Sequence, residues 1–125
     1  MVLLKAEAQI GLGDLTGAQA TFKTLTDKRY SAPLPAAPDF GGNTTTAYQY
    51  LLNERRKELA FEGFRYVDIK RLGKLAGKGI ERDSQDCSYY NACSLDPTDH
   101  RFVFPIPTSE LTANSAIRGQ QNPGY

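Results

Sequence analysis

The residues with the clearest chemical potential lie in one segment, Asn53 to Arg71, which reads NERRKELAFEGFRYVDIKR. Ten of its nineteen residues are charged, yet it has the most regular helical spacing in the chain. Steps of three and four residues align five charged side chains with Leu52 and Leu72, on the face expected to be buried. These five are Arg55, Glu58, Glu62, Arg65 and Asp68.

Two interpretations of this charged stripe compete. A lone buried charge is strongly unfavourable, whereas arginines and carboxylates at helical contact spacing can form charge-assisted, bidentate bonds. The stripe is therefore either an internal ion-pair network that fixes how the helix packs, or a catalytic or metal-binding carboxylate cluster. The choice between them decides much of the function.

The elements that position the stripe are predicted to be helices. Residues 2–12 and a second helix after Gly13 form a short-turned antiparallel pair, with Asp14 or Thr16 as the cap. The predicted buried residues are Leu3, Leu4, Ala8 and Leu12 in the first helix, and Ala18, Phe22 and Leu25 in the second. Small residues in both helices allow close approach, as in tetratricopeptide hairpins.

A third helix is predicted from a threonine cap among Thr44, Thr45 and Thr46 to about Phe61. The buried stripe that runs along this part of the chain is expected to contain Tyr48, Leu51, Leu52, Leu59 and Phe64. Gly63 marks a bend, followed by a shorter helix over residues 65–73. The predicted fold class is mainly α: a tetratricopeptide-like helical hairpin plus further helices with long irregular loops.

The remaining segments are predicted to be irregular. Residues 30–46 contain three prolines within eight positions, and residues 74–101 lack a sustained period. The segment FVFPIP, residues 102–107, is expected to be extended and to lie against the helices. A short helix capped by Thr108 and ending near Asn114 precedes a turn-rich tail, GQQNPGY.

Bulk properties exclude several classes of protein. The length of 125 residues predicts one domain, and the net charge of +1 makes nucleic acid an unsuitable partner. No run of about eighteen apolar residues is present, so the chain is expected to be soluble as written. Lys5 and Glu7 interrupt the short apolar start, so any export signal is expected to lie outside this sequence.

The two cysteines, Cys87 and Cys93, enclose the sequence SYYNA. A structural zinc site needs four ligands, and neither a second cysteine pair nor nearby histidines are present. A disulfide that closes a small loop is the favoured interpretation, and two free thiols are the alternative. A disulfide would indicate an oxidising compartment such as a periplasm or a cell surface.

Three segments together resemble the carboxy-terminal part of the SusD/RagB-like family of outer-membrane nutrient-binding proteins. They are LLKAEAQIGLGD, ERRKELAFEGFRYVDIKRLGK and FPIPTSELTANSAIRGQQNPGY, in that order. Each motif alone is modest, but the pairing of the second with the third is specific. Residues 1–125 are accordingly expected to be a SusD/RagB-like carboxy-terminal domain, with the family's amino-terminal half outside this sequence.

The resemblance implies a helical protein held on the outer leaflet by a lipid on an amino-terminal cysteine. Members of the family lie over a TonB-dependent, SusC-like barrel, capture glycans or other oligomers, and pass them inward without chemical change. The implied function is non-catalytic capture with no cofactor. The alternative is a helical scaffold that binds a partner protein and no sugar.

In the resembling family the charged positions form part of a fold signature, which favours a structural network over a reactive site. A glycosidase would need Glu58 and Glu62 about 5 to 9 Å apart with a sugar between them, and a general acid of raised pKa. Neighbouring arginines would lower that pKa. A helical di-metal site pairs Glu with His at i+3, but the only histidine, His100, lies in a predicted loop.

The best local candidates for ligand contact are Tyr89, Tyr90 and Asn91, within the predicted disulfide loop and next to Asp86. Sugar C–H faces pack on aromatic rings while hydroxyl groups pair with polar side chains. A loop that merely covers the helices is the competing interpretation. Tyr30 and Phe40, in the proline-rich segment, are weaker candidates.

Overall fold

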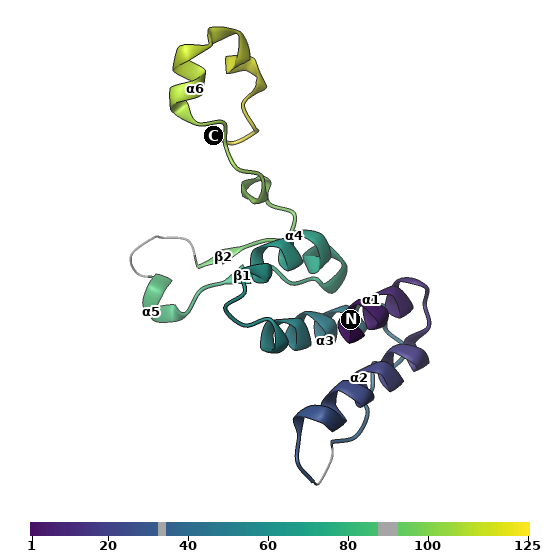
Figure 1. Ribbon diagram of the computed structural model, residues 1–125. Coiled ribbons are helices and arrows are strands. Elements are labelled where there is room, and N and C mark those ends of the chain that lie inside the picture. Colours follow the sequence, from purple (N-terminus) through teal and green to yellow (C-terminus); the bar gives the residue numbers. More distant parts are fainter. Residues whose placement is uncertain (33–34, 88–92) are drawn as a thin grey trace. The chain divides into compact units, whose positions relative to one another are not determined.

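The computed structural model describes residues 1–32, 35–87 and 93–125 and is mainly α, as the sequence predicts (Figure 1). Two compact units, Met1–Lys78 and Gly79–Tyr125, divide the chain. The first unit contains the four longest described helices: α1 (Val2–Gly11), α2 (Leu15–Arg29), α3 (Thr44–Glu58) and α4 (Phe64–Ala76). The second contains β1 (Ile80–Glu81), α5 (Ser84–Cys87), β2 (Ser94–Leu95), a 3₁₀ turn (His100–Phe102), α6 (Thr108–Ala113) and a second 3₁₀ segment (Ser115–Gln120).

Helices α1 and α2 form the predicted antiparallel hairpin. The Oδ1 atom of Asp14 accepts a hydrogen bond from the Gly17 amide at 2.9 Å, which caps the start of α2. The predicted face of α1 was wrong, because its buried residues are Ala6 and Ile10. Leu4 lies on the opposite side of the helix and is 57% exposed. Alanine at position 6 leaves room for a neighbouring helix, which a bulkier leucine would not.

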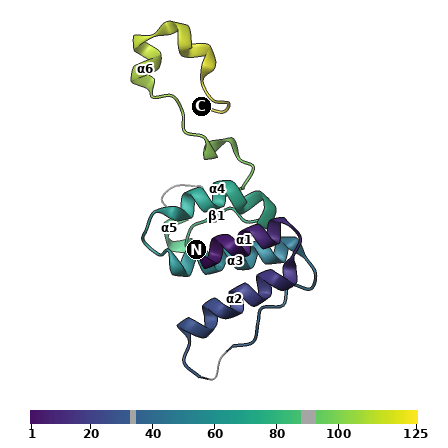
Figure 2. The ribbon, with the colours of Figure 1, turned by 45° about the vertical axis from the view of Figure 1, so that its right-hand side comes forward.

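Helix α3 packs against both α1 and α4, so the first unit is a layered helical cluster (Figure 2). Leu51 and Leu52 of α3 and Ile69 of α4 are fully or almost fully buried. Asn43, not a threonine, caps α3: its side-chain oxygen accepts hydrogen bonds from the amides of Thr45 and Thr46 at 2.8 and 3.3 Å. An Asn side chain is short enough to reach these amides, and it is a preferred capping group.

The turn between α3 and α4 begins earlier than predicted. Helix α3 ends at Glu58, and α4 begins at Phe64. Phe61 has a φ of 65°, a left-handed conformation that is uncommon for a residue with a bulky side chain. The predicted bend is therefore present but spans residues 59–63, and it leaves Phe64 exposed although the sequence placed it in the core.

An aromatic cluster anchors the segment between α2 and α3. Phe40 is 2% exposed, and its ring centroid lies 6.0 Å from that of Phe22 in an edge-to-face arrangement. Tyr50 packs edge-on against Phe22 at 4.9 Å. Such pairs contribute beyond their buried area. Phe40 is thus a core residue, which argues against its weaker role as a ligand contact.

The second unit contains a small sheet that the sequence did not predict. Strands β1 and β2 are antiparallel, with Ile80 opposite Leu95. Two-residue strands are too short to give a periodic pattern. In α6 the cap is Pro107 with no side-chain bond, so the predicted capping role of Thr108 was wrong. Thr108 is instead the first helical residue, and its carbonyl accepts a hydrogen bond from the Thr112 hydroxyl.

The carboxy-terminal tail is attached to the segment 104–106 by side-chain amides. The Gln121 side chain accepts from the Ile106 amide at 2.8 Å and donates to the Ile106 carbonyl at 3.1 Å. The Asn122 side chain donates to the Phe104 carbonyl. These amides therefore have the partners that a buried polar group requires.

The end of the tail meets His100. The His100 and Tyr125 rings are edge-to-face with centroids 5.6 Å apart. Gly124, at a φ of 85°, lies so close that a Cβ atom there would be 2.2 Å from the Nε2 atom of His100. Glycine is thus required by both backbone conformation and space. Across the described residues, no helix has the length and apolar character needed to cross a membrane.

Candidate functional site

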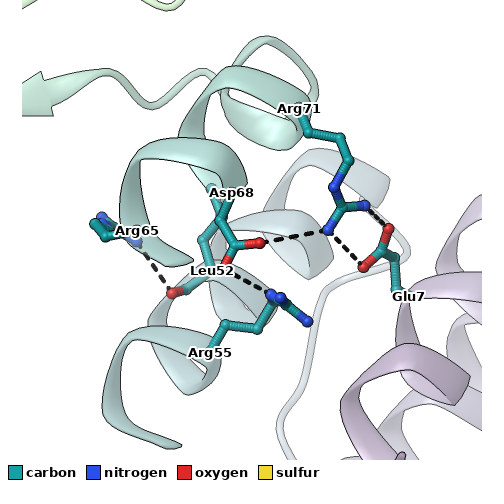
Figure 3. Close-up of polar contacts among 6 residues, drawn as sticks. All are labelled: Glu7, Leu52, Arg55, Arg65, Asp68 and Arg71. Atoms are coloured by element: carbon teal, nitrogen blue, oxygen red, sulfur yellow. Dashed lines mark hydrogen bonds and ion pairs between the residues drawn. The ribbon is translucent and has the colours of Figure 1, made fainter. Parts of the chain in front are cut away.

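Arg55 and Asp68 form the centre of the predicted charged stripe. The Arg55 Nε atom donates to Asp68 Oδ2 at 2.8 Å, and the two side chains are only 9% and 5% exposed (Figure 3). Arg55 belongs to α3 and Asp68 to α4, so this buried ion pair joins the two helices. The other three predicted members do not bond to either residue in the described contacts.

Asp68 extends the network to a helix far away in the sequence. Arg71 Nη2 lies 3.4 Å from Asp68 Oδ1, and the Arg71 guanidinium also bonds to both carboxylate oxygens of Glu7 in α1. Figure 3 shows the resulting chain of alternating charge from Arg55 to Glu7. Arg71 and Glu7 were not among the residues predicted for the stripe. Arg71 is three residues after Asp68 and was detectable by helical spacing, whereas no local pattern relates Glu7 to it.

Glu58 pairs with α2 instead of joining the network. The Arg29 Nε and Nη2 atoms donate to the two carboxylate oxygens of Glu58 at 2.7 and 2.6 Å, a bidentate arrangement. These bonds from Arg29 lower the pKa of Glu58, although partial burial acts in the opposite direction. A carboxyl group with a lowered pKa is poorly suited to act as a general acid.

Arg65 and Glu62 are not in the interior, contrary to the predicted stripe. Arg65 is exposed and donates to the backbone carbonyl of Leu52 at 3.2 Å (Figure 3). Glu62 is exposed in the turn between α3 and α4. The physical reason is that α3 ends at Glu58, so the following residues no longer continue its helical face.

A further buried acid, Glu54, was not singled out from the sequence. It is 6% exposed and bonds to the ammonium group of Lys57 at 2.6 Å. Burial, and then the negative charge of Glu54, raise the pKa of the nearby Tyr50 phenol. The spacing of three between Glu54 and Lys57 is visible in the sequence, but both residues lie outside the predicted stripe.

The chemistry of these carboxylates is that of structural ion pairs. Asp68, Glu7, Glu58 and Glu54 each accept a hydrogen bond from a cationic side chain. Across residues 1–32, 35–87 and 93–125, no group of three or more His, Cys, Asp or Glu side chains could hold a metal ion. The ion pairs therefore connect three pairs of helices: α3 with α4, α4 with α1, and α2 with α3.

Two cavities flank the turn between α3 and α4. One has a volume of ≈ 410 Å³ and is lined by Arg55, Arg56, Leu59, Ala60, Phe61, Gly63, Phe64, Arg65 and Asp68. The other has a volume of ≈ 530 Å³ and shares Arg55, Leu59 and Phe64 with the first. It continues to the start of α1, at Met1 to Leu4.

The predicted ligand-contact residues Tyr89, Tyr90 and Asn91 lie outside the described residues. The cysteines at either side of them are close together, with a Cα–Cα distance of 4.9 Å. That distance lies within the range of disulfides, so it supports the predicted pairing of Cys87 with Cys93. Tyr30 is described and is 54% exposed.

Comparison with protein families gives a match that covers all 125 residues. The model of the SusD family matches residues 1–125. A search of curated proteins and a search of solved structures each gave no match.

Proposed function

Because the chain belongs to the SusD family, we propose that it is part of a protein that captures glycans or other oligomers at the cell surface without altering them chemically. Membership of the family implies a nutrient-binding protein of the outer membrane. The proposal adds a SusC-like TonB-dependent barrel as the partner that takes up the captured oligomer. It also includes a lipid anchor on a segment amino-terminal to residue 1, and residues 1–125 as the carboxy-terminal domain.

The family match carries this proposal, and the charged residues support its non-catalytic part. The two carboxylates that a glycosidase would use as acid and base, Glu58 and Glu62, are in different environments. Glu58 accepts two hydrogen bonds from Arg29, while Glu62 lies in an exposed turn. Glycoside hydrolysis requires one carboxyl group that stays protonated, and the contacts of Glu58 favour the ionised form.

For the ligand contact we retain Tyr89, Tyr90 and Asn91 as the proposed residues. Two tyrosine rings and an amide offer the apolar faces and the hydrogen-bonding groups that a sugar needs. Closure of the loop by Cys87 and Cys93 would reduce the conformational entropy that the tyrosines lose on binding. This part of the proposal depends on residue type and on the proximity of the cysteines.

A glycan microarray probed with the 125-residue protein tests the proposal. We expect binding that Tyr90→Ala abolishes and that Leu75→Ala leaves intact, since Leu75 is an exposed residue of the other unit. Equal binding by both variants would refute the assignment of the loop. Chromatography of the bound glycan after incubation should show unchanged chain length, and shorter products that vanish in Glu62→Gln would refute the non-catalytic role.

A second candidate is a protein-interaction scaffold. It is favoured by the α1–α2 hairpin and by the exposed apolar residues of α1, such as Leu4 and Leu12 at 57% and 86% exposure. Under this hypothesis a barrel protein would co-purify with the chain, and no glycan on the array would bind. Glycan binding that is lost in Tyr90→Ala would exclude it as the main role.

A further inference from the structure

We propose that the turn between α3 and α4 is a docking surface for an acidic protein segment that also carries apolar side chains. The docking surface consists of Arg56, Leu59, Phe61, Phe64 and Arg65. None of these residues has a role in the proposed capture of oligomers. The inference therefore stands or falls separately from that function.

Phe61 is the central observation. Its side chain is fully exposed, at 108% of the reference area, while its φ of 65° is unfavourable for any residue other than glycine, asparagine or aspartate. Both features oppose folding of the isolated chain, and no contact in the described structure offsets them. A partner that covers the ring would recover the apolar surface area, and non-glycine residues in such conformations cluster at functional positions.

The apolar part of the docking surface continues on both sides of Phe61. The cavity of ≈ 410 Å³ has Leu59, Ala60, Phe61 and Phe64 along its wall. The adjoining cavity of ≈ 530 Å³ shares Leu59 and Phe64. Phe64 is itself 45% exposed. A partner side chain could thus insert beside Phe64 while the Phe61 ring packs on the partner.

The charge of the docking surface is net positive, because its two arginines outnumber Glu62, the exposed carboxylate of the same turn. Arg56 and Arg65 both line the smaller cavity, and among the described residues no carboxylate lies within ion-pair distance of either. Asp68 also lines it, but its oxygens are bonded to Arg55 and Arg71. Partial burial and then the charge of Arg56 lower the pKa of Arg65. A carboxylate from a partner would relieve this repulsion and bond to the guanidinium groups.

The lining favours a protein segment over an acidic glycan. Aromatic residues and arginine dominate the binding energy of protein interfaces, and here they adjoin leucine, valine and methionine side chains. A sugar needs several amides or hydroxyl groups to bind its own hydroxyls. The lining residues of the smaller cavity include no Ser, Thr, Tyr, Asn or Gln.

The test is fluorescence anisotropy of a labelled amphipathic peptide with leucine on one face and glutamate on the other. We expect binding that weakens with added salt, because screening reduces attraction between exposed charges. Phe61→Gly should weaken binding by about tenfold or more. The double variant Arg56→Gln, Arg65→Gln should do the same. Phe61→Gly also removes the unfavourable φ, so a melting temperature at or above that of the unmodified protein would exclude unfolding as the cause.

Matched controls keep the result interpretable. Leu75→Ala removes another exposed apolar side chain, at 49% exposure, and should leave the affinity unchanged. The same peptide with glutamine in place of glutamate should bind weakly. The proposal is overturned if the acidic peptide does not bind, if Phe61→Gly binds it as well as the unmodified protein does, or if oligogalacturonate binds at this surface and the peptide does not.

Discussion

Arg55 illustrates what a single buried guanidinium does in this molecule. It neutralises Asp68, whose side chain is 5% exposed and whose other oxygen has only a longer contact to Arg71, at 3.4 Å. If Arg55 were truncated, the Asp68 carboxylate would remain in the interior without its closest opposite charge. Stability at this position therefore depends on the pair and not on either residue alone.

We predict that Arg55→Ala lowers the free energy of unfolding by about 3 kcal/mol, because removing one partner of a buried pair leaves an uncompensated charge. Arg29→Ala also removes an arginine from a carboxylate, but the Arg29 side chain is 57% exposed and its loss should be clearly smaller. Urea unfolding followed by circular dichroism measures both. Equal losses in the two variants would contradict the buried network.

Glu58 makes the stability sensitive to acid. Its folded-state pKa is lowered, mainly by the hydrogen bonds from Arg29, so its contribution is present above the pKa of the unfolded chain. That contribution disappears as the pH falls through the lower, folded-state value. In Arg29→Gln the pKa of Glu58 should rise toward its ordinary range. An NMR titration of the Glu58 carboxyl carbon measures this, and an unchanged midpoint would refute the bidentate contact.

At the scale of elements, long helices were predictable and their ends were not. The periodic spacing of Leu51, Leu52 and Leu72 gave α3 and α4 their buried faces. A helix is capped by whichever suitable side chain reaches the free amides of its first turn. In α3 that side chain is Asn43 and not one of the threonines. The face of α1 was misplaced because the larger leucines were given more weight than the alanines, whereas the close approach of a neighbouring helix selected Ala6.

In the tail, the Gln121 side chain makes the two hydrogen bonds to the Ile106 backbone that a neighbouring strand would otherwise make. We predict that Gln121→Leu exposes the Ile106 amide and increases its hydrogen exchange by tenfold or more, which corresponds to about 1.4 kcal/mol of local stability. Gln120→Leu changes the exposed glutamine directly before Gln121, at the end of the 3₁₀ segment, and should have little effect. Similar exchange in the two variants would show that the tail is held by other contacts.

At the scale of the whole molecule, the family and the mainly α fold were evident from the sequence. The motifs ERRKELAFEGFRYVDIKR and QNPGY include residues that the structure shows bonding: Asp68 and Arg71 in the first, Gln121 and Asn122 in the second. The contact between Arg71 and Glu7 was not predictable, since it joins positions 64 residues apart. The prediction of a single domain rested on length, whereas contacts divide the chain at Lys78.

The candidate site was only partly predictable for the same reason. Helical spacing identified Arg55 and Asp68, but it assumed that one continuous face ran through Glu62 and Arg65. A backbone reversal at Phe61 ended that face, and nothing about phenylalanine suggests a left-handed conformation. Consequently Glu62 and Arg65 were assigned to the interior although they lie at the surface.

The close approach of Gly124 to the imidazole of His100 has a consequence for sequence drift. Even alanine at position 124 would collide with the ring and would also adopt a disfavoured backbone angle. Trimming the imidazole would remove the first obstacle and leave the second. Substitution of residue 100 is therefore compatible with Gly124. Substitution of Gly124 stays unfavourable whatever residue occupies position 100.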